Sequence, residues 1–147
     1  MMYGLGIQEP SNGRIFTCFF IYSFGLIFML CTDLQKYLIL KYKTGLIDNY
    51  FLAKNRNTNY LGEIMIYFSF ALIVGRYECY ILLIFVWITF FAGRIYIKEK
   101  SLQKKEGYAK YKKNSYLILF KFFDNHLING FLYIIIFIIF VYITKNF

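Results

Sequence analysis

One proline, one histidine and three cysteines are all that the 147 residues contain of these types. The cysteines (Cys18, Cys31 and Cys79) form no CxxC pair or metal-ligand spacing, and each falls in or beside an apolar run. We therefore expect them to be packing residues, with no disulfide framework. His126 stands alone and cannot build a histidine metal cluster, so no metal site is predicted.

Acidic residues are also scarce, with 8 against 17 basic residues and a formal net charge of +9. Such an excess can signal nucleic-acid binding, but these basic residues lie in blocks between apolar segments, as in membrane loops. The chain is 59% hydrophobic and 23% aromatic, whereas soluble domains are nearer ~45–50% apolar. The composition predicts one membrane domain over residues 1–147, with the lipid bilayer as its partner and no nucleic acid.

Four apolar segments predict an all-α fold, a polytopic transmembrane helical bundle. A membrane span needs ~20 apolar residues, within a range of about 17–25. The second segment is the shortest and carries the carboxylate of Glu63. We also expect a turn at Gly45 and a helix break near Gly107. The predicted membrane helices are Ile15–Cys31, Tyr60–Gly75, Cys79–Ile97 and Leu127–Ile143.

The basic residues predict the topology. Thirteen of the seventeen lie in residues 32–59 and 94–113. The connection Arg76–Glu78 is short, so the second and third helices form a hairpin and both basic segments emerge on one side of the membrane. By the positive-inside rule that side is cytosolic. We expect loops 32–59 and 98–126 to be cytosolic, with residues 116–123 at the membrane interface.

Three polar side chains mark the start of the second predicted helix. Asn59 and Glu63 are four residues apart and so share one helix face, with Tyr60 adjacent and Tyr67 one turn beyond Glu63. An amide, a carboxylate and a phenol on one face can hold a polar ligand by hydrogen bonds. Glu63 is also close enough to the interface to reach water or to cap the helix. The spacing leaves both interpretations open.

Charged residues gather where two other helices leave the membrane. Arg94 and Lys98, four apart, suit a phosphate-bearing ligand, and they suit ordinary anchoring at the interface equally. Asp33 and Lys36 are spaced for a local ion pair. A solvated basic helix explains residues 98–113 about as well as a ligand site does. That segment also carries two tyrosines among its lysines, Tyr108 and Tyr111.

The order of these segments resembles the C-terminal half of the membrane steroid 5α-reductase-like family. The stretches that carry the resemblance are "DLQKY", "RNTNYLGE", "R-x-x-x-KEKSL" and "EGYAKYKK", over about residues 24–113. "NYLGE" is the most specific of them. Sterol reductases and isoprenylcysteine carboxyl methyltransferases have similar segments. The sequence departs from the family pattern at Thr58, where a proline is usual, and in its extra C-terminal helix 127–143.

The resemblance implies a helical bundle that holds NADPH from the cytosolic side. It implies a hydride transfer to a C=C bond of a hydrophobic lipid, such as a sterol, a polyprenol or an enoyl-lipid, in the endoplasmic reticulum membrane. Relatives carry further helices before the "DLQK" segment that supply the substrate-polarising residues, so catalytic residues are not assigned. The cofactor-binding residues implied by the resemblance are Asp33, Lys36, Asn59, Tyr60, Glu63, Arg94, Lys98, Glu99, Tyr108 and Tyr111.

Two other functions stay open at this stage. A membrane methyltransferase that uses S-adenosylmethionine shares the Gly-containing turn and the Tyr-rich tail, but usually has no carboxylate directly after that Gly, where this chain has Glu63. The second alternative is a non-catalytic membrane remnant or scaffold. The chain is accordingly expected to be a truncated product, half of a partnered assembly, or a divergent member without catalysis.

Overall fold

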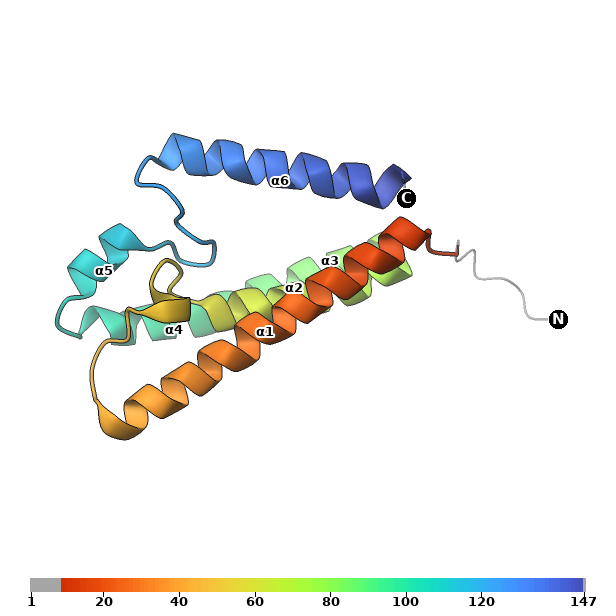
Figure 1. The fold of residues 1–147 in the computed structure, drawn as a ribbon. Helices are drawn as coiled ribbons and strands as arrows, with labels where there is room; N and C mark the ends of the chain where they lie inside the picture. Colours follow the sequence, from red (N-terminus) through yellow and green to blue (C-terminus); the bar gives the residue numbers. More distant parts are fainter. Residues whose placement is uncertain (1–8, 147) are drawn as a thin grey trace.

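The computed structural model describes residues 9–146, and the regular structure of this part is helical (Figure 1). Within it, three helical stretches are long and apolar enough to cross a membrane: Asn12–Tyr42, Tyr77–Gln103 and His126–Ile143. The all-α prediction is confirmed, and three of the four predicted spans coincide with such stretches. The elements are α1 (Asn12–Tyr42), α2 (Thr58–Val74), α3 (Tyr77–Val86), α4 (Ala92–Gln103), α5 (Tyr108–Asn114) and α6 (His126–Asn146).

Helix α1 is longer than predicted. It continues to Tyr42, eleven residues past Cys31, so the first part of the predicted loop 32–59 is helical. The charged residues of this extension end the apolar run, but Lys, Gln and Leu are good helix formers and the helix persists through them. Lys43 is extended, and Gly45 follows at φ 119°, a conformation that favours glycine. The turn expected at Gly45 is confirmed.

The predicted hairpin is also present. Helix α2 ends at Gly75, whose φ of 70° forms a left-handed cap, and α3 begins two residues later. Helices α3 and α4 are joined by a π-helical turn, Trp87–Phe91, and run as one stretch to Gln103. The chain then breaks, and Gly107, at φ 79°, precedes α5. The break expected near Gly107 is therefore confirmed.

Helices α1 and α2 run side by side in opposite directions and cross at two glycines (Figure 1). A Cβ on Gly62 would lie 2.5 Å from the carbonyl oxygen of Gly25 and 2.6 Å from the amide nitrogen of Met29. A Cβ on Gly25 would lie 2.8 Å from the carbonyl oxygen of Gly62. The backbones approach this closely only because neither position has a side chain.

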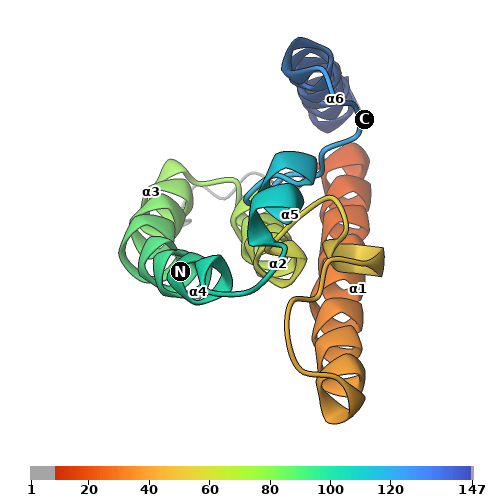
Figure 2. The same cartoon turned by 90° about the vertical axis from the view of Figure 1, so that its left-hand side faces the viewer.

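Helix α6 lies beside α1 and apart from α3 and α4 (Figure 2). Asn129, 1% exposed, ties the irregular chain before it to the helix. Its amide nitrogen donates to the carbonyl oxygens of Phe123 (2.6 Å) and Asn125 (2.9 Å), and its oxygen accepts from the amide of Phe122 (3.0 Å). Residues 116–123 are thus held as extended and turning chain, with no helix between α5 and α6 in the described part.

The α1–α2 crossing gives the first testable prediction. Gly62→Ala should lower the free energy of unfolding by about 1–3 kcal/mol, because the added methyl meets backbone atoms that cannot rotate away. Gly130→Ala is the matched control: apart from the adjoining residues and backbone of its own helix, no atom of the described chain lies within 4 Å of its added Cβ. It should be neutral or stabilise α6 by roughly 0.5–1 kcal/mol. Thermal unfolding in detergent measures both, and equal melting temperatures would contradict the close crossing.

Candidate functional site

A polar loop before α2 is almost completely buried. Asn55, Asn57 and Thr58 are each 0% exposed and Arg56 is 6% exposed. Buried polar groups need hydrogen-bond partners, and the chain after α5 supplies several of them, although the side-chain oxygen of Asn57 has none among the described residues. The Arg56 amide donates to the carbonyl oxygen of Tyr116 at 3.0 Å, and the Asn57 side chain donates to that of Leu117 at 2.8 Å. Two segments sixty residues apart are thereby joined.

Thr58 and Asn55 hold this loop from within. The Thr58 hydroxyl donates to the carbonyl oxygen of Phe51 at 2.6 Å. The side-chain oxygen of Asn55 accepts from the amide of Asn57 at 2.8 Å, which is a local turn typical of asparagine. Thr58 therefore fixes the start of α2 by hydrogen bonding. It stands where the family that the sequence resembles usually has proline.

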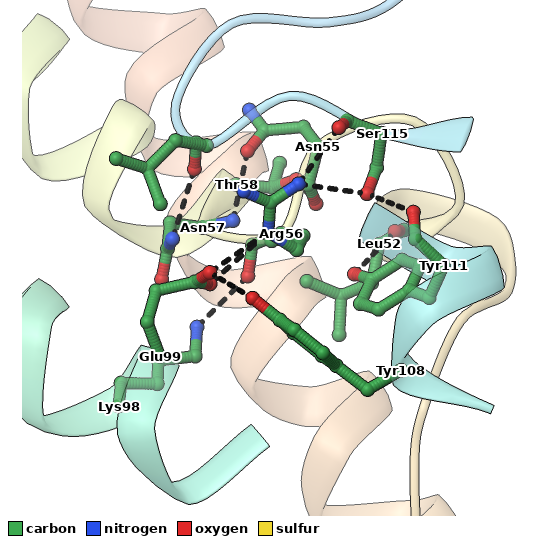
Figure 3. Close-up of polar contacts among 11 residues, drawn as sticks. Leu52, Asn55, Arg56, Asn57, Thr58, Lys98, Glu99, Tyr108, Tyr111 and Ser115 are labelled. Carbon is green, nitrogen blue, oxygen red and sulfur yellow. Dashed lines mark hydrogen bonds and ion pairs between the residues drawn. The ribbon is translucent and has the colours of Figure 1, made fainter. Parts of the chain in front are cut away.

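Arg56 is the centre of a buried ionic network (Figure 3). Its Nε lies 3.1 Å from Glu99 Oε1, and the two side chains are 7% and 13% exposed. Its Nη1 donates to the carbonyl oxygen of Ser115 at 2.7 Å. The Tyr108 hydroxyl donates to Glu99 Oε2 at 2.6 Å. The guanidinium therefore joins the α2 entry loop, α4 and the chain after α5, while Tyr108 adds α5 through the same carboxylate.

The network engages three residues that the resemblance assigns to a cofactor. Glu99 contacts both Arg56 and Tyr108, and the Tyr111 hydroxyl donates to the carbonyl oxygen of Leu52 at 2.7 Å. Burial, reinforced by the Glu99 hydrogen bond, raises the pKa of Tyr108, and burial raises the pKa of Tyr111. Both phenols stay protonated and act as hydrogen-bond donors at neutral pH. Their contacts in this structure support the fold.

Lys98 links the network to the predicted face of α2. Its ammonium group donates to the carbonyl oxygen of Arg56 at 3.0 Å and lies 5.3 Å from the ring centre of Tyr60 (Figure 3 shows the first contact). The Tyr60 ring packs edge-on against Phe91 of the π-helical turn, with centroids 5.8 Å apart. The sequence-predicted residues Tyr60 and Lys98 are therefore neighbours across two helices.

Glu63 lies within the electrostatic influence of charged groups from two other helices. The charges that act on its carboxylate belong to Arg94, Asp33 and Lys36. Asp33 and Lys36 also form the local ion pair expected from their spacing, with Lys36 Nζ 3.1 Å from Asp33 Oδ1. These four residues and Tyr60 surround the same end of the α1–α2 pair.

A small pocket of about 180 Å³ opens beside this end of the pair. Four basic side chains line it: Lys36 from α1, Arg56 from the loop, Lys98 from α4, and Lys105 from the turn after α4. Arg94 is exposed and is not a lining residue. The remaining lining residues are Leu40, Ile47, Leu52, Ser101, Leu102 and Tyr111. Bases on apolar walls suit an anionic group, because weak solvation strengthens each charge–charge contact.

Sequence reasoning missed two of these bases. Arg56 stands inside the quoted stretch "RNTNYLGE", so its place beside Asn59 was a usable signal. Lys105 reaches the pocket because its ammonium group donates to the carbonyl oxygen of Gly45 at 2.7 Å, a contact across sixty residues that no local pattern marks. Both were treated as ordinary loop charges.

Asn59 brings an unsatisfied group to this region. Its side-chain oxygen is buried and has no hydrogen-bond partner among the described residues, and the same holds for the hydroxyl of Thr32. Asn59 lies one turn before Gly62 on α2, and Thr32 lies two turns after Gly25 on α1. Both lie on the same side of the α1–α2 crossing. Buried polar atoms without partners are uncommon, and a bound ligand or water is a usual explanation.

No protein-family model, curated protein or solved structure matches the chain.

The Arg56–Glu99 pair gives the second prediction. Arg56→Ala should destabilise the protein by about 3–5 kcal/mol, because it leaves the Glu99 carboxylate buried without its cation. Arg76→Ala is the matched control, since Arg76 forms an ion pair with Glu78 in which both side chains are 44% exposed. Exposed pairs contribute only ~0–1 kcal/mol. Thermal unfolding in detergent compares the two variants. Equal losses of stability would show that the buried Arg56–Glu99 pair contributes no more than an exposed pair.

Proposed function

We propose that the chain is an integral membrane protein that binds NADPH at its cytosolic side and belongs to a reductase system acting on a C=C bond of a lipid. The observation that carries the proposal is the basic pocket formed by Lys36, Arg56, Lys98 and Lys105. NADPH carries three phosphate groups, and clustered guanidinium and ammonium groups bind phosphate strongly. The resemblance in residues 24–113 supports the same cofactor.

The size of the pocket indicates which part of the cofactor it would receive. Sites that enclose a whole ligand usually measure ~300–1,000 Å³, so a pocket of about 180 Å³ suits one phosphate-bearing end. Lys98 and Lys105 would hold that end. The side-chain oxygen of Asn59 has no partner in the described chain. It would accept a hydrogen bond from the rest of the NADPH molecule, which would lie along the α1–α2 face.

The reaction is assigned by chemical class. When bound, NADPH supplies a hydride for one carbon of an activated C=C bond. The contribution of this chain is to bind and orient: Lys98 fixes the anionic end, while the Tyr60 ring beneath its ammonium group restricts where that end lies. Glu99, Tyr108 and Tyr111 contribute indirectly, because they position Arg56 and the loop that leads into α2, where Asn59 lies.

A four-span topology is part of the proposal. Helix α2 has 17 residues and so a length of ~26 Å, a few ångströms short of a ~30 Å hydrocarbon core. Local thinning of the bilayer accommodates such a mismatch at modest cost. With α2 as a span, residues 43–57 and 104–125 lie on one side, and their basic residues make that side cytosolic. The endoplasmic reticulum membrane remains the proposed location.

The basic pocket favours NADPH over S-adenosylmethionine. S-adenosylmethionine carries a sulfonium cation and no phosphate, so four basic side chains would disfavour its charged centre. The methyltransferase alternative therefore rests on the sequence resemblance alone. A direct comparison of the two ligands separates the two functions.

Ligand binding to purified protein in detergent gives the third prediction. NADPH should bind saturably, and Lys98→Met should raise its Kd about 10- to 100-fold, since one charge-assisted contact contributes ~1.5–3 kcal/mol. Lys100→Met is the control, because Lys100 is exposed on the same helix and its ammonium lies over Tyr96. Intrinsic NADPH fluorescence measures binding, and thermal unfolding verifies that both variants are folded.

The outcomes are distinct. Equal Kd values for the two variants would remove Lys98 from the binding site. Saturable binding of S-adenosylmethionine, with none of NADPH, would replace the reductase proposal by the methyltransferase one. The absence of binding by either ligand would leave the scaffold interpretation.

A further inference from the structure

Three apolar hollows follow one side of α1 and join end to end. Their volumes are about 480, 420 and 580 Å³. The first and second share Tyr50 and Phe51, and the second and third share Leu38, Ile39 and Tyr50. We call them together the α1 groove. On α1 it extends from Phe28 to Tyr42, which is fifteen residues with a rise of ~21 Å between the first and the last.

The lining of the α1 groove changes from apolar to polar along its length. The first hollow is lined by the aromatic side chains Phe28, Tyr50, Phe51, Phe120 and Phe122. The third includes Lys43, Asp48 and Asn49 beyond the end of the apolar run of α1. An amphiphile with one long apolar chain and a charged head has the same gradient. Because the groove borders a helix long enough to cross a membrane, the surrounding lipid can supply such a molecule.

Tyr50 stands where the three hollows meet, in a strained conformation. Its φ is 46°, in the left-handed region that residues other than glycine rarely adopt. The residue is 78% exposed. Gln35 of α1 fixes the backbone on both sides of it. The side-chain nitrogen of Gln35 donates to the carbonyl oxygen of Asn49 at 2.9 Å. Its side-chain oxygen accepts from the backbone amide of Phe51 at 3.1 Å.

This strain needs an explanation other than packing of the Tyr50 ring within the chain. A residue in such a conformation persists only where its surroundings over-determine it, and these residues cluster at ligand clamps. The exposed ring of Tyr50 gains little from burial in the structure. Its fixed position at the junction of the hollows is what a clamp on a bound chain requires.

We propose that the α1 groove binds one membrane phospholipid, with an acyl chain along α1 against Tyr50, Phe51 and Phe122 and with the phosphate beside Lys43. The groove and the basic pocket use different residues of α1: Leu34, Leu38 and Tyr42 belong to the groove, whereas Lys36 and Leu40 line the pocket. Outside α1, Ile47 lines both the third hollow and the pocket, so the two sites adjoin, but the lipid proposal does not rest on the proposed NADPH site.

Fluorescence quenching in detergent tests the proposal. The chain has a single tryptophan, so Trp87→Phe gives a background protein without tryptophan fluorescence. In it, Phe122→Trp places a reporter on the wall of the first hollow. Tyr37→Trp is the matched control, because Tyr37 is 66% exposed on α1 and is not among the lining residues of the groove. The probe is phosphatidylglycerol brominated on its acyl chain, added at a low mole fraction of the micelle.

The two reporters should respond differently. Quenching of the Phe122→Trp reporter should saturate at one lipid per protein, whereas quenching of the Tyr37→Trp reporter should rise in proportion to the lipid in the micelle. Proportional quenching at both positions would overturn the proposal, because it would show only the lipid that surrounds any membrane helix. A concentration-dependent dimer that abolishes the saturable phase would overturn it too, and would assign the groove to a second copy of the chain.

The strained tyrosine gives a second, independent measurement. Tyr50→Gly on the Phe122→Trp reporter should weaken the saturable phase about tenfold, while the melting temperature without lipid stays the same or rises, because glycine adopts this φ freely. A fall in melting temperature with unchanged lipid affinity would show that Tyr50 is structural, and would overturn its place in the site.

Discussion

The buried ion pair between Arg56 and Glu99 is the contact on which the polar end of the helical bundle depends. Arg56 lies in a loop that would otherwise expose its polar side chains, and its guanidinium is shared between the Glu99 carboxylate and the carbonyl oxygen of Ser115. Tyr108 bonds to the same carboxylate and so brings α5 to α4. The loop in turn fixes where α2 begins, and the α1–α2 crossing then follows from the two glycines. One charge pair and its hydrogen bonds thus join four segments: the loop before α2, α4, α5 and the chain after α5.

The fold could be predicted to the extent that its signals are local. Run lengths indicated the apolar helices, and the short connection Arg76–Glu78 indicated the hairpin. Gly107 indicated the break, because left-handed backbone favours glycine. The extension of α1 to Tyr42 was missed because hydropathy falls at Asp33 while helix propensity does not. The pairing of residues 54–57 with 115–118 was beyond reach, since it joins segments sixty residues apart and leaves no periodic pattern in either.

In the candidate site, too, the sequence predicted what local spacing determines and missed what contacts between distant segments determine. Helical spacing brought Asn59, Tyr60 and Glu63 onto one face and identified Lys98, whose ammonium group does lie against Tyr60. The same spacing could not show that Glu99, one residue on, points into a protein network. Residues that are neighbours in the sequence, such as Lys98 and Glu99, therefore differ in what they do: some line the basic pocket, and others form contacts that position the lining residues. Arg56 does both, because its side chain lines the pocket and also pairs with Glu99.

The pairing of charges determines which bases remain able to attract an anion. Glu99 offsets Arg56, and Asp33 offsets Lys36. Lys98 and Lys105 instead donate to the backbone carbonyl oxygens of Arg56 and Gly45, which carry only partial charge. Their ammonium groups are therefore held in place by contacts that involve no carboxylate. A phosphate arriving between them would meet pre-positioned cations and would not have to displace a carboxylate, so little of the binding energy is lost to reorganisation. Because the ion pair at Arg56 is what holds one of those carbonyl oxygens in place, the stability of the fold and the affinity of the pocket rest on the same contact.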